Sequence, residues 1–294
     1  MKTEQINIAV LGNDGIGKTT LLSALTAYAE KYGYGEQLDT FDIDVTSIKK
    51  DDVVVSFAKV DVEAGKTYSF YEFDTITDFY KGVISGAVRI DAVLHVYNSE
   101  FVFLPYQRDM LRFLKNVGID TIVGCCNLSE FVDVEFLELN DIEYEGTLED
   151  CGFEDCAAYH FAINCEYASM AFEDALSQVE NLFDCIADQA HALDTTHAPS
   201  ARVTNFEAAV YVLKPQEGGN VRPLVSPAAI RFSGETSTCA CTFLDPNDDG
   251  MVLPGDQKKL AIKLDSPRTL RMGDFLYLEC WGKTAAIARV VALD

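Results

Sequence analysis

The chain has 294 residues, 48% hydrophobic and 24% charged, so about two domains can each bury an ordinary core. Its 23 Lys and Arg against 47 Asp and Glu give a formal net charge of −24, which repels a phosphate backbone, so nucleic acid is not an expected partner. No apolar run is long enough for a membrane span or a secretory signal, and the nine cysteines lack paired spacing, so we expect a cytoplasmic protein with reduced thiols and no membrane partner.

Short apolar runs alternate with helical patterns from Met1 to about Ala190. Three runs are apolar on both faces, as in a buried parallel sheet, and predict strands at Ile6–Leu11, Asp91–Tyr97 and Thr121–Cys126. Amphipathic spacing predicts helices at Thr19–Lys31, Pro105–Val117 and Tyr167–Ala190. Two alternating runs, Val53–Val62 and Lys66–Phe73, predict a hairpin. This order predicts a doubly wound α/β domain over residues 1–190.

The rest of the chain has a different pattern. Residues 191–204 lack periodicity and predict a linker. From residue 205 to 294, short β-rich runs are separated by Gly, Pro and Asp turns, which predicts a small all-β barrel. The predicted strands are Phe206–Leu213, Ala229–Phe232, Cys239–Leu244, Lys259–Leu264, Phe275–Cys280 and Ala285–Ala292.

The loop between the first predicted strand and helix matches the phosphate-loop spacing G-x-x-x-x-G-K-[ST]. Backbone N–H groups in such a loop, with the helix N-terminus, bind phosphates. Lys18 is expected to reach the β- and γ-phosphates, and the Thr19 hydroxyl to ligate Mg²⁺. The predicted nucleotide contacts are Gly12, Asn13, Asp14, Gly15, Ile16, Gly17, Lys18, Thr19 and Thr20. The alternative, a glycine-rich turn that only joins strand to helix, is disfavoured by the complete spacing in this context.

Gly12–Leu21 resembles the first guanine-nucleotide motif of the bacterial elongation factor Tu family. The resemblance continues through residues 78–87, Ile90–Val96 and Gln107–Gly118. The β-rich part is similar to the third domain of that family at Asn205–Leu213, Glu217–Gly219 and Val252–Asp256. The resemblance implies a P-loop GTPase-like domain, then a third-domain-like barrel without the middle barrel, and GTP or GDP with Mg²⁺ as ligands.

The catalytic motifs of that family are altered here. Its D-x-x-G motif and the following histidine fall on Glu72–Thr75 and Ile76. By this resemblance Asp74, or alternatively Glu72, holds Mg²⁺ through water together with Thr19. Thr75 replaces a glycine whose missing side chain allows close approach, and Ile76 cannot orient a water molecule. We therefore expect slow or absent hydrolysis and assign no catalytic residue.

The base-recognition motif is also altered. The N-K-x-D of the family becomes Asn127-Leu128-Ser129-Glu130. Asn127 is retained, and Glu130 can accept hydrogen bonds from guanine, although its extra methylene displaces the bidentate pair. Asn127 and Glu130 are thus the expected base contacts, and guanine preference is implied by the resemblance only.

Other features leave two interpretations open. Between Lys115 and Arg202 there are nineteen Asp and Glu and no Lys or Arg, which indicates either a solvated acidic face or a docking surface for a basic protein.

The cysteines and the single tryptophan carry no clear site. Cys125-Cys126 and Cys239-x-Cys241 lack a second pair at zinc spacing, so we expect buried free thiols. Trp281 either anchors a partner or packs in the barrel.

Three functions remain. The first is an elongation factor Tu-like protein that binds nucleotide, hydrolyses it slowly or not at all, and acts as a binding or regulatory module for a translation-related or basic protein. The second is an active GTPase in translation, although the missing middle barrel argues against tRNA delivery. The third is a structural mimic that binds a protein and no nucleotide, which the complete phosphate loop disfavours.

Overall fold

The computed structural model describes residues 4–13, 15–33, 35–36, 38, 47–50, 53–62, 66–73, 76–84, 88–98, 105–116, 118–127, 134–153, 158–161, 184–186, 200–232, 238–244 and 251–293. Asp14, Asp74, Thr75 and Glu130 lie outside these residues, as does the predicted helix Tyr167–Ala190 except for a helical turn at 184–186. The chain forms two compact units, Met1–Phe79 with Arg89–Ala192, and Tyr80–Val88 with Leu193–Asp294. No helix among the described residues is long and apolar enough to cross a membrane.

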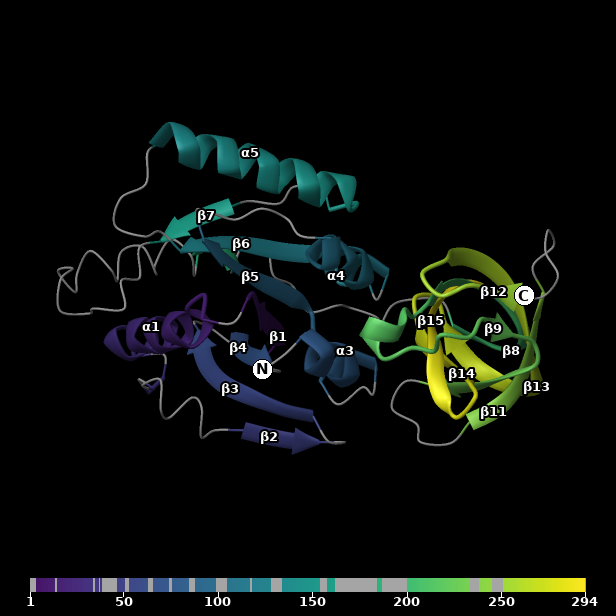
Figure 1. Ribbon diagram of the computed structural model, residues 1–294. Coiled ribbons are helices and arrows are strands. Elements are labelled where there is room, and N and C mark those ends of the chain that lie inside the picture. The colour runs from purple at the N-terminus through teal and green to yellow at the C-terminus, as the bar shows by residue number, and fades with distance from the viewer. Residues whose placement is uncertain are drawn as a thin grey trace. The chain divides into compact units, whose positions relative to one another are not determined.

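The first unit is built on a seven-stranded sheet with the order β2-β3-β4-β1-β5-β6-β7 (Figure 1). Its strands are β1 (Glu4–Leu11), β2 (Ser47–Lys50), β3 (Val53–Val62), β4 (Lys66–Phe73), β5 (Ala92–Asn98), β6 (Thr121–Asn127) and β7 (Ala158–Phe161). Strands β4, β1, β5, β6 and β7 are parallel neighbours, whereas β3 is antiparallel to both β2 and β4. The three predicted buried strands and the predicted hairpin strands are confirmed.

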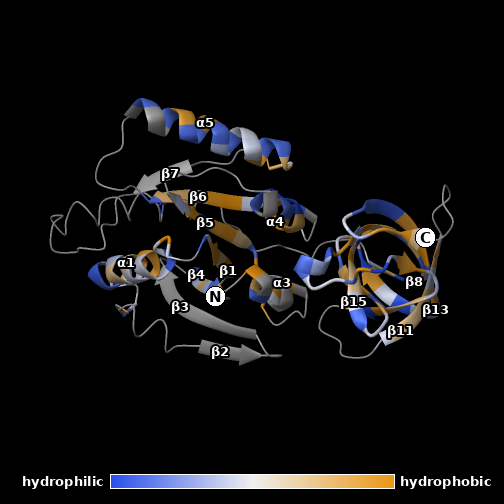
Figure 2. Ribbon diagram, viewed as in Figure 1, coloured by the Kyte–Doolittle hydropathy of each residue, from blue (hydrophilic) through white to orange (hydrophobic). Residues whose placement is uncertain are grey.

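Helices cover both faces of this sheet. They are α1 (Lys18–Lys31), α4 (Pro105–Asn116), α5 (Val134–Asp150) and the start of α3 (Ile76–Ile84), which belongs to this unit as far as Phe79. On one face, Leu21 and Leu25 of α1 pack in a buried cluster with residues of β1, β4, β5 and β6. On the other face, the ring of Phe79 in α3 meets that of Phe113 in α4, with centroids 6.1 Å apart, and Tyr144 of α5 stacks on Tyr97 of β5 at 4.3 Å. The unit therefore has three layers, and Figure 2 shows hydrophobic strands β5 and β6 within it.

The second unit contains a closed antiparallel barrel of six strands in the order β10-β11-β13-β8-β15-β14. Its strands are β8 (Ser200–Val212), β10 (Ala228–Phe232), β11 (Thr238–Leu244), β13 (Gln257–Arg271), β14 (Phe275–Cys280) and β15 (Lys283–Leu293). A separate ribbon pairs β9 (Leu224–Val225) with β12 (Met251–Val252), and a 3₁₀ turn, η2, spans Pro215–Glu217. Each of the six predicted barrel strands is found, and β8 also includes residues 200–204 of the segment predicted as a linker.

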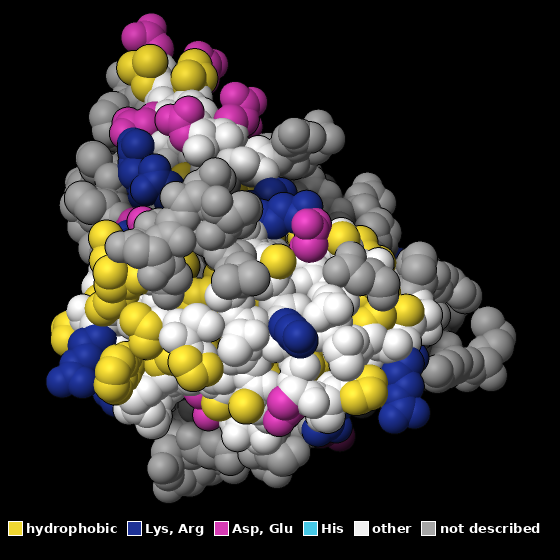
Figure 3. All heavy atoms as spheres, turned by 90° about the vertical axis from the view of Figure 1, so that its right-hand side faces the viewer, with side chains coloured by type: hydrophobic (Ala, Val, Ile, Leu, Met, Phe, Trp, Pro, Cys, Tyr) yellow, Lys and Arg dark blue, Asp and Glu magenta, His cyan; other side chains and the backbone are white. Residues whose placement is uncertain are grey.

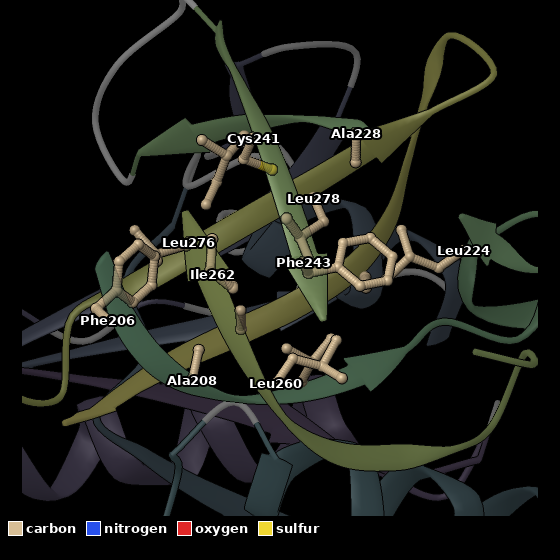
Figure 4. Packing of buried hydrophobic residues seen from close by; sticks show 14 of the residues in the cluster. Phe206, Ala208, Leu224, Ala228, Cys241, Phe243, Leu260, Ile262, Leu276 and Leu278 are labelled. Carbon is tan, nitrogen blue, oxygen red and sulfur yellow. The ribbon is translucent and has the colours of Figure 1, made fainter. Parts of the chain in front are cut away.

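Alternating residues of the barrel strands form its core. Phe206 and Ala208 of β8 are 1% and 0% exposed, whereas Asn205, which precedes Phe206 and points to the other face of the strand, is exposed. Figure 4 shows Phe243, Ile262 and Leu278 from three further strands pointing into the same cluster. Closure of the barrel pairs every one of its strands on both sides, which leaves none with an unpaired edge.

Candidate functional site

The predicted phosphate loop lies between the central strand β1 and helix α1. Strand β1 ends at Leu11, and α1 begins at Lys18. A Cβ on Gly12 would collide with the carbonyl oxygen of Val96 in the neighbouring strand β5, so only glycine fits there. Gly17, the N-cap of α1, has φ 96° and ψ 23°, a left-handed conformation that glycine adopts without strain. The geometry in which the loop meets the helix therefore requires glycine at position 12 and favours it at position 17.

The Lys18 side chain folds back along the loop. It is 7% exposed, and its Nζ donates to the carbonyl oxygens of Gly12 (3.3 Å) and Asn13 (3.1 Å). An ammonium group has three donors, so Lys18 can bind an anion in the loop while two donors stay on loop carbonyls. The Lys18 ammonium group is thus held against the backbone of the loop.

The next residue, Thr19, contacts an acid from another strand. Its hydroxyl donates a 2.9 Å hydrogen bond to Oε1 of Glu72, which is 9% exposed near the end of β4. Glu72 was the alternative to Asp74 in the sequence analysis, and it is the acid that the structure places beside Thr19. No group of three or more His, Cys, Asp or Glu suited to a metal is found in the described part of the chain. A hydroxyl and one carboxylate suit Mg²⁺, which usually takes its other ligands from water and substrate phosphates.

Asn127 reaches the loop from the carboxyl end of β6. Its Nδ2 donates a 2.9 Å hydrogen bond to the carbonyl oxygen of Ile16 and lies 2.9 Å from where a Cβ of Gly17 would stand. The side chain predicted to contact the base therefore braces the backbone of the phosphate loop. This contact was not foreseen, because it joins two residues 111 apart in the sequence.

The described site residues thus meet at one end of the sheet. Gly12, Asn13, Gly15, Ile16 and Gly17 form the loop, and Lys18, Thr19 and Thr20 form the first turn of α1. No side chain caps this turn and the turn itself contains no acidic residue, so the acid at this end of the helix dipole is Glu72 of β4, beside Thr19. Together the loop, Lys18 and the helix end can bind an anion with several oxygens.

An aromatic group below the site fixes α5 on the sheet. His95 of β5 shares a 3.0 Å hydrogen bond between its Nδ1 and the Tyr144 hydroxyl of α5. Full burial lowers the pKa of His95 to about 4, so the ring is neutral at neutral pH. A Cβ on Gly124 of β6 would meet the Tyr144 ring at 2.6 Å, which explains the glycine in a buried strand.

The cysteines that the structure describes are free thiols. Burial raises the pKa of Cys126 and of Cys241 to about 12, and it also raises the pKa of Cys125 well above its ordinary value. The prediction of buried free thiols is confirmed for these three, whereas Cys239 is half-buried. Such thiols are inert at neutral pH.

No family model matches the chain.

Proposed function

We propose that this protein binds GTP or GDP with Mg²⁺ in the loop from Gly12 to Thr20, and hydrolyses GTP slowly or not at all. In this proposal it is an elongation factor Tu-like binding or regulatory module, with a P-loop GTPase-like domain followed by a third-domain-like barrel. The observation that carries it is the adjacent pair of Lys18, buried within the loop, and Thr19, hydrogen-bonded to Glu72.

The phosphates are expected to lie over the loop. The uncapped N–H groups at the start of α1 and the Lys18 ammonium supply donors and positive charge for them. Mg²⁺ would be held by the Thr19 hydroxyl, with Glu72 accepting from a water molecule on the ion or ligating it directly. The hydrogen bond from Thr19 to Glu72 keeps both oxygens in position before the ion binds.

Slow hydrolysis is expected from the altered catalytic motif. The residue that aligns with the water-orienting histidine of the family is Ile76, the first residue of α3, which has no group to polarise water. GTP hydrolysis depends on such positioning, because the enzyme's contribution is mainly orientation and electrostatic stabilisation. Binding without turnover is the behaviour of a module that presents a nucleotide-dependent surface to a protein partner.

A thermal-unfolding titration tests the proposal, with GTP, GDP, ATP or no nucleotide, each with and without Mg²⁺. A ligand at 100 times its dissociation constant adds about 2.7 kcal/mol to folding stability. We expect a raised midpoint with GTP and GDP in Mg²⁺, and its loss in Lys18→Ala. Lys31→Ala, an exposed lysine at the other end of α1, is the matched control and should keep the shift.

Two outcomes contradict parts of the proposal. A flat response to every nucleotide would mean that the loop is a relic and that the protein is a structural mimic. A shift accompanied by rapid phosphate release would mean that the protein is an active GTPase despite Ile76.

A further inference from the structure

Helix α5 carries an exposed apolar stripe on the side away from the sheet. Its buried side faces β5, where Tyr144 stacks on Tyr97. Leu139 and Ile142, three residues apart on the other side of the helix, are 65% and 67% exposed. Gly146, one turn after Ile142, is exposed as well, and a Cβ there would meet nothing within 4 Å. Packing within the described part of the chain therefore explains none of these three residues.

Acidic side chains flank this stripe. By helical spacing, Glu138 and Glu145 lie along one edge of it and Glu143 along the other, and all three are exposed. Figure 3 shows Asp and Glu side chains above and below hydrophobic ones at the top of the view, the height at which α5 lies in Figure 1. We define the outer face of α5 as the set Glu138, Leu139, Ile142, Glu143, Glu145 and Gly146.

The sequence around this face supplies no cation to balance it. Helix α5 has seven Asp and Glu among its 17 residues and no Lys or Arg, and none occurs between Lys115 and Arg202. Its last turn has no basic residue to favour the helix dipole, and Glu145 and Glu149 repel each other at a spacing of four residues. A glycine inside a helix also lowers its stability. Locally unfavourable residues gathered on one face are typical of a surface that a partner covers.

The charge of the outer face selects the partner. A nucleic acid, an anionic membrane and a second copy of the same face are all repelled by it. A basic amphipathic helix is complementary, because its apolar residues can cover Leu139 and Ile142 while its Lys and Arg meet the glutamates at both edges. Gly146 allows the two helix axes to approach closely. We propose that the outer face of α5 docks a basic amphipathic helix of a partner protein. This surface goes beyond nucleotide binding and does not depend on it.

The test uses fluorescence anisotropy of a labelled model peptide with the whole 294-residue chain. The peptide has about 18 residues, Leu and Lys in helical spacing, which is long enough to run the length of α5. We expect saturable binding, weakened about tenfold in Leu139→Gln, since covering one Leu side chain is worth about that factor. Val221→Gln is the matched control: Val221 is 81% exposed in the barrel unit, so binding should be unchanged.

Two further variants separate docking from support of the fold. In Gly146→Ala the unfolding midpoint should rise, because alanine is the better helix former, whereas peptide binding should weaken because the added methyl holds the two helices apart. Glu143→Gln should weaken binding about threefold at low salt and less at high salt. Its control, Glu30→Gln at an exposed position of α1, should leave binding as it is.

Peptide binding should be the same in Lys18→Ala and with or without nucleotide, so a failure at either site leaves the other proposal standing. Three results would overturn the docking proposal: the same loss in Val221→Gln as in Leu139→Gln, equally tight binding of a peptide of the same composition in a non-amphipathic order, or equally tight binding of the counterpart with Glu in place of Lys. The absence of any saturable binding would overturn it as well.

Discussion

The Thr19 hydroxyl on the first turn of α1 donates a 2.9 Å hydrogen bond to Oε1 of Glu72, 53 residues further along the chain. The parallel pairing of β1 with β4 explains the contact, since Glu72 lies opposite Val10, two residues before the loop. A carboxylate at that position of β4 therefore lies beside the first turn of α1, the helix that follows β1. The contact therefore depends on sheet register as much as on the loop itself.

Replacing Glu72 by Gln should separate the contribution of Mg²⁺ from that of the phosphates. Gln keeps the size and can still accept from Thr19, but it lacks the charge that attracts the ion. We expect nucleotide affinity in Mg²⁺ to fall about tenfold, the scale of one charge-assisted contact, with little change in EDTA. Isothermal titration calorimetry with GDP in each buffer measures both values.

The control for this variant is Glu135→Gln, at an exposed position of α5. It makes the same change of net charge away from the loop and should leave both affinities as they are. An equal loss with and without Mg²⁺ in Glu72→Gln would show that Glu72 supports the loop and does not serve the ion.

The phosphate loop could be predicted from the sequence because all of its defining residues are neighbours in the chain. Gly12 to Thr19 are neighbours in sequence, and the apolar run before them and the amphipathic run after them indicate strand and helix. The partners of the loop come from β4 and β6, and no local pattern contains their register. Glu72 was therefore one of two candidates, and the contact of Asn127 with Ile16 was not predicted.

Helix α5 was missed for a different reason. Its buried residues include Tyr144 and Leu148, but Leu139 and Ile142 are 65% and 67% exposed. Apolar residues on more than one side of the helix remove the clear amphipathic period from which a helix is predicted. The barrel strands alternate cleanly because one face of each is buried, and their positions were correspondingly predictable.

Asn127→Ala tests whether this side chain serves the base or the loop. The variant loses the 2.9 Å hydrogen bond to the Ile16 carbonyl oxygen. Since that bond orders the loop, we expect GDP and inorganic pyrophosphate to lose affinity by a similar factor, roughly three- to tenfold for one hydrogen bond. Competition binding measures both. A loss confined to GDP would instead assign Asn127 to base recognition.

Gly17→Ala and Gly15→Ala form a matched pair in the same loop. Both glycines have positive φ, 96° and 73°, so alanine costs about 1 kcal/mol of backbone strain at either position. At Gly17 the added Cβ also meets Asn127 Nδ2 at 2.9 Å, whereas nothing lies within 4 Å at Gly15. Chemical denaturation should therefore show a larger loss of stability for Gly17→Ala.

The difference between these two variants should shrink in an Asn127→Ala background, because the clashing amide is then absent. A difference that persists undiminished in that background would mean that Asn127 does not restrict Gly17.

His95 should make stability depend on pH. Burial lowers its pKa to about 4 from an ordinary 6.5, so the unfolded chain binds a proton that the folded chain excludes. Its contribution is complete above pH 6.5 and is lost as the pH falls toward 4, by about 1.4 kcal/mol per pH unit. His95→Gln cannot take up the proton. The difference in urea-unfolding free energy, wild type minus His95→Gln, should therefore fall across this window, and parallel profiles would contradict the assignment.

The Trp281 side chain lies outside the core of the barrel. It is 57% exposed at the turn between β14 and β15, with φ 59°, so it does not pack in the barrel core. A bulky residue at positive φ costs roughly 1 kcal/mol, and Asn tolerates that conformation in a two-residue hairpin turn. The Arg222 guanidinium lies 5.0 Å from the indole ring centroid, an exposed contact worth about 0.5–1 kcal/mol.

These two terms nearly cancel, so Trp281→Asn should change the unfolding free energy by no more than about 0.5 kcal/mol. Leu278→Ala, at a fully buried position of β14 in the same barrel, should cost about 2–5 kcal/mol and shows that the measurement responds to core packing. Chemical denaturation of the two variants beside the wild type makes the comparison. A loss for Trp281→Asn that approaches that of Leu278→Ala would mean that the indole stabilises the barrel after all, through contacts beyond its stacking on Arg222.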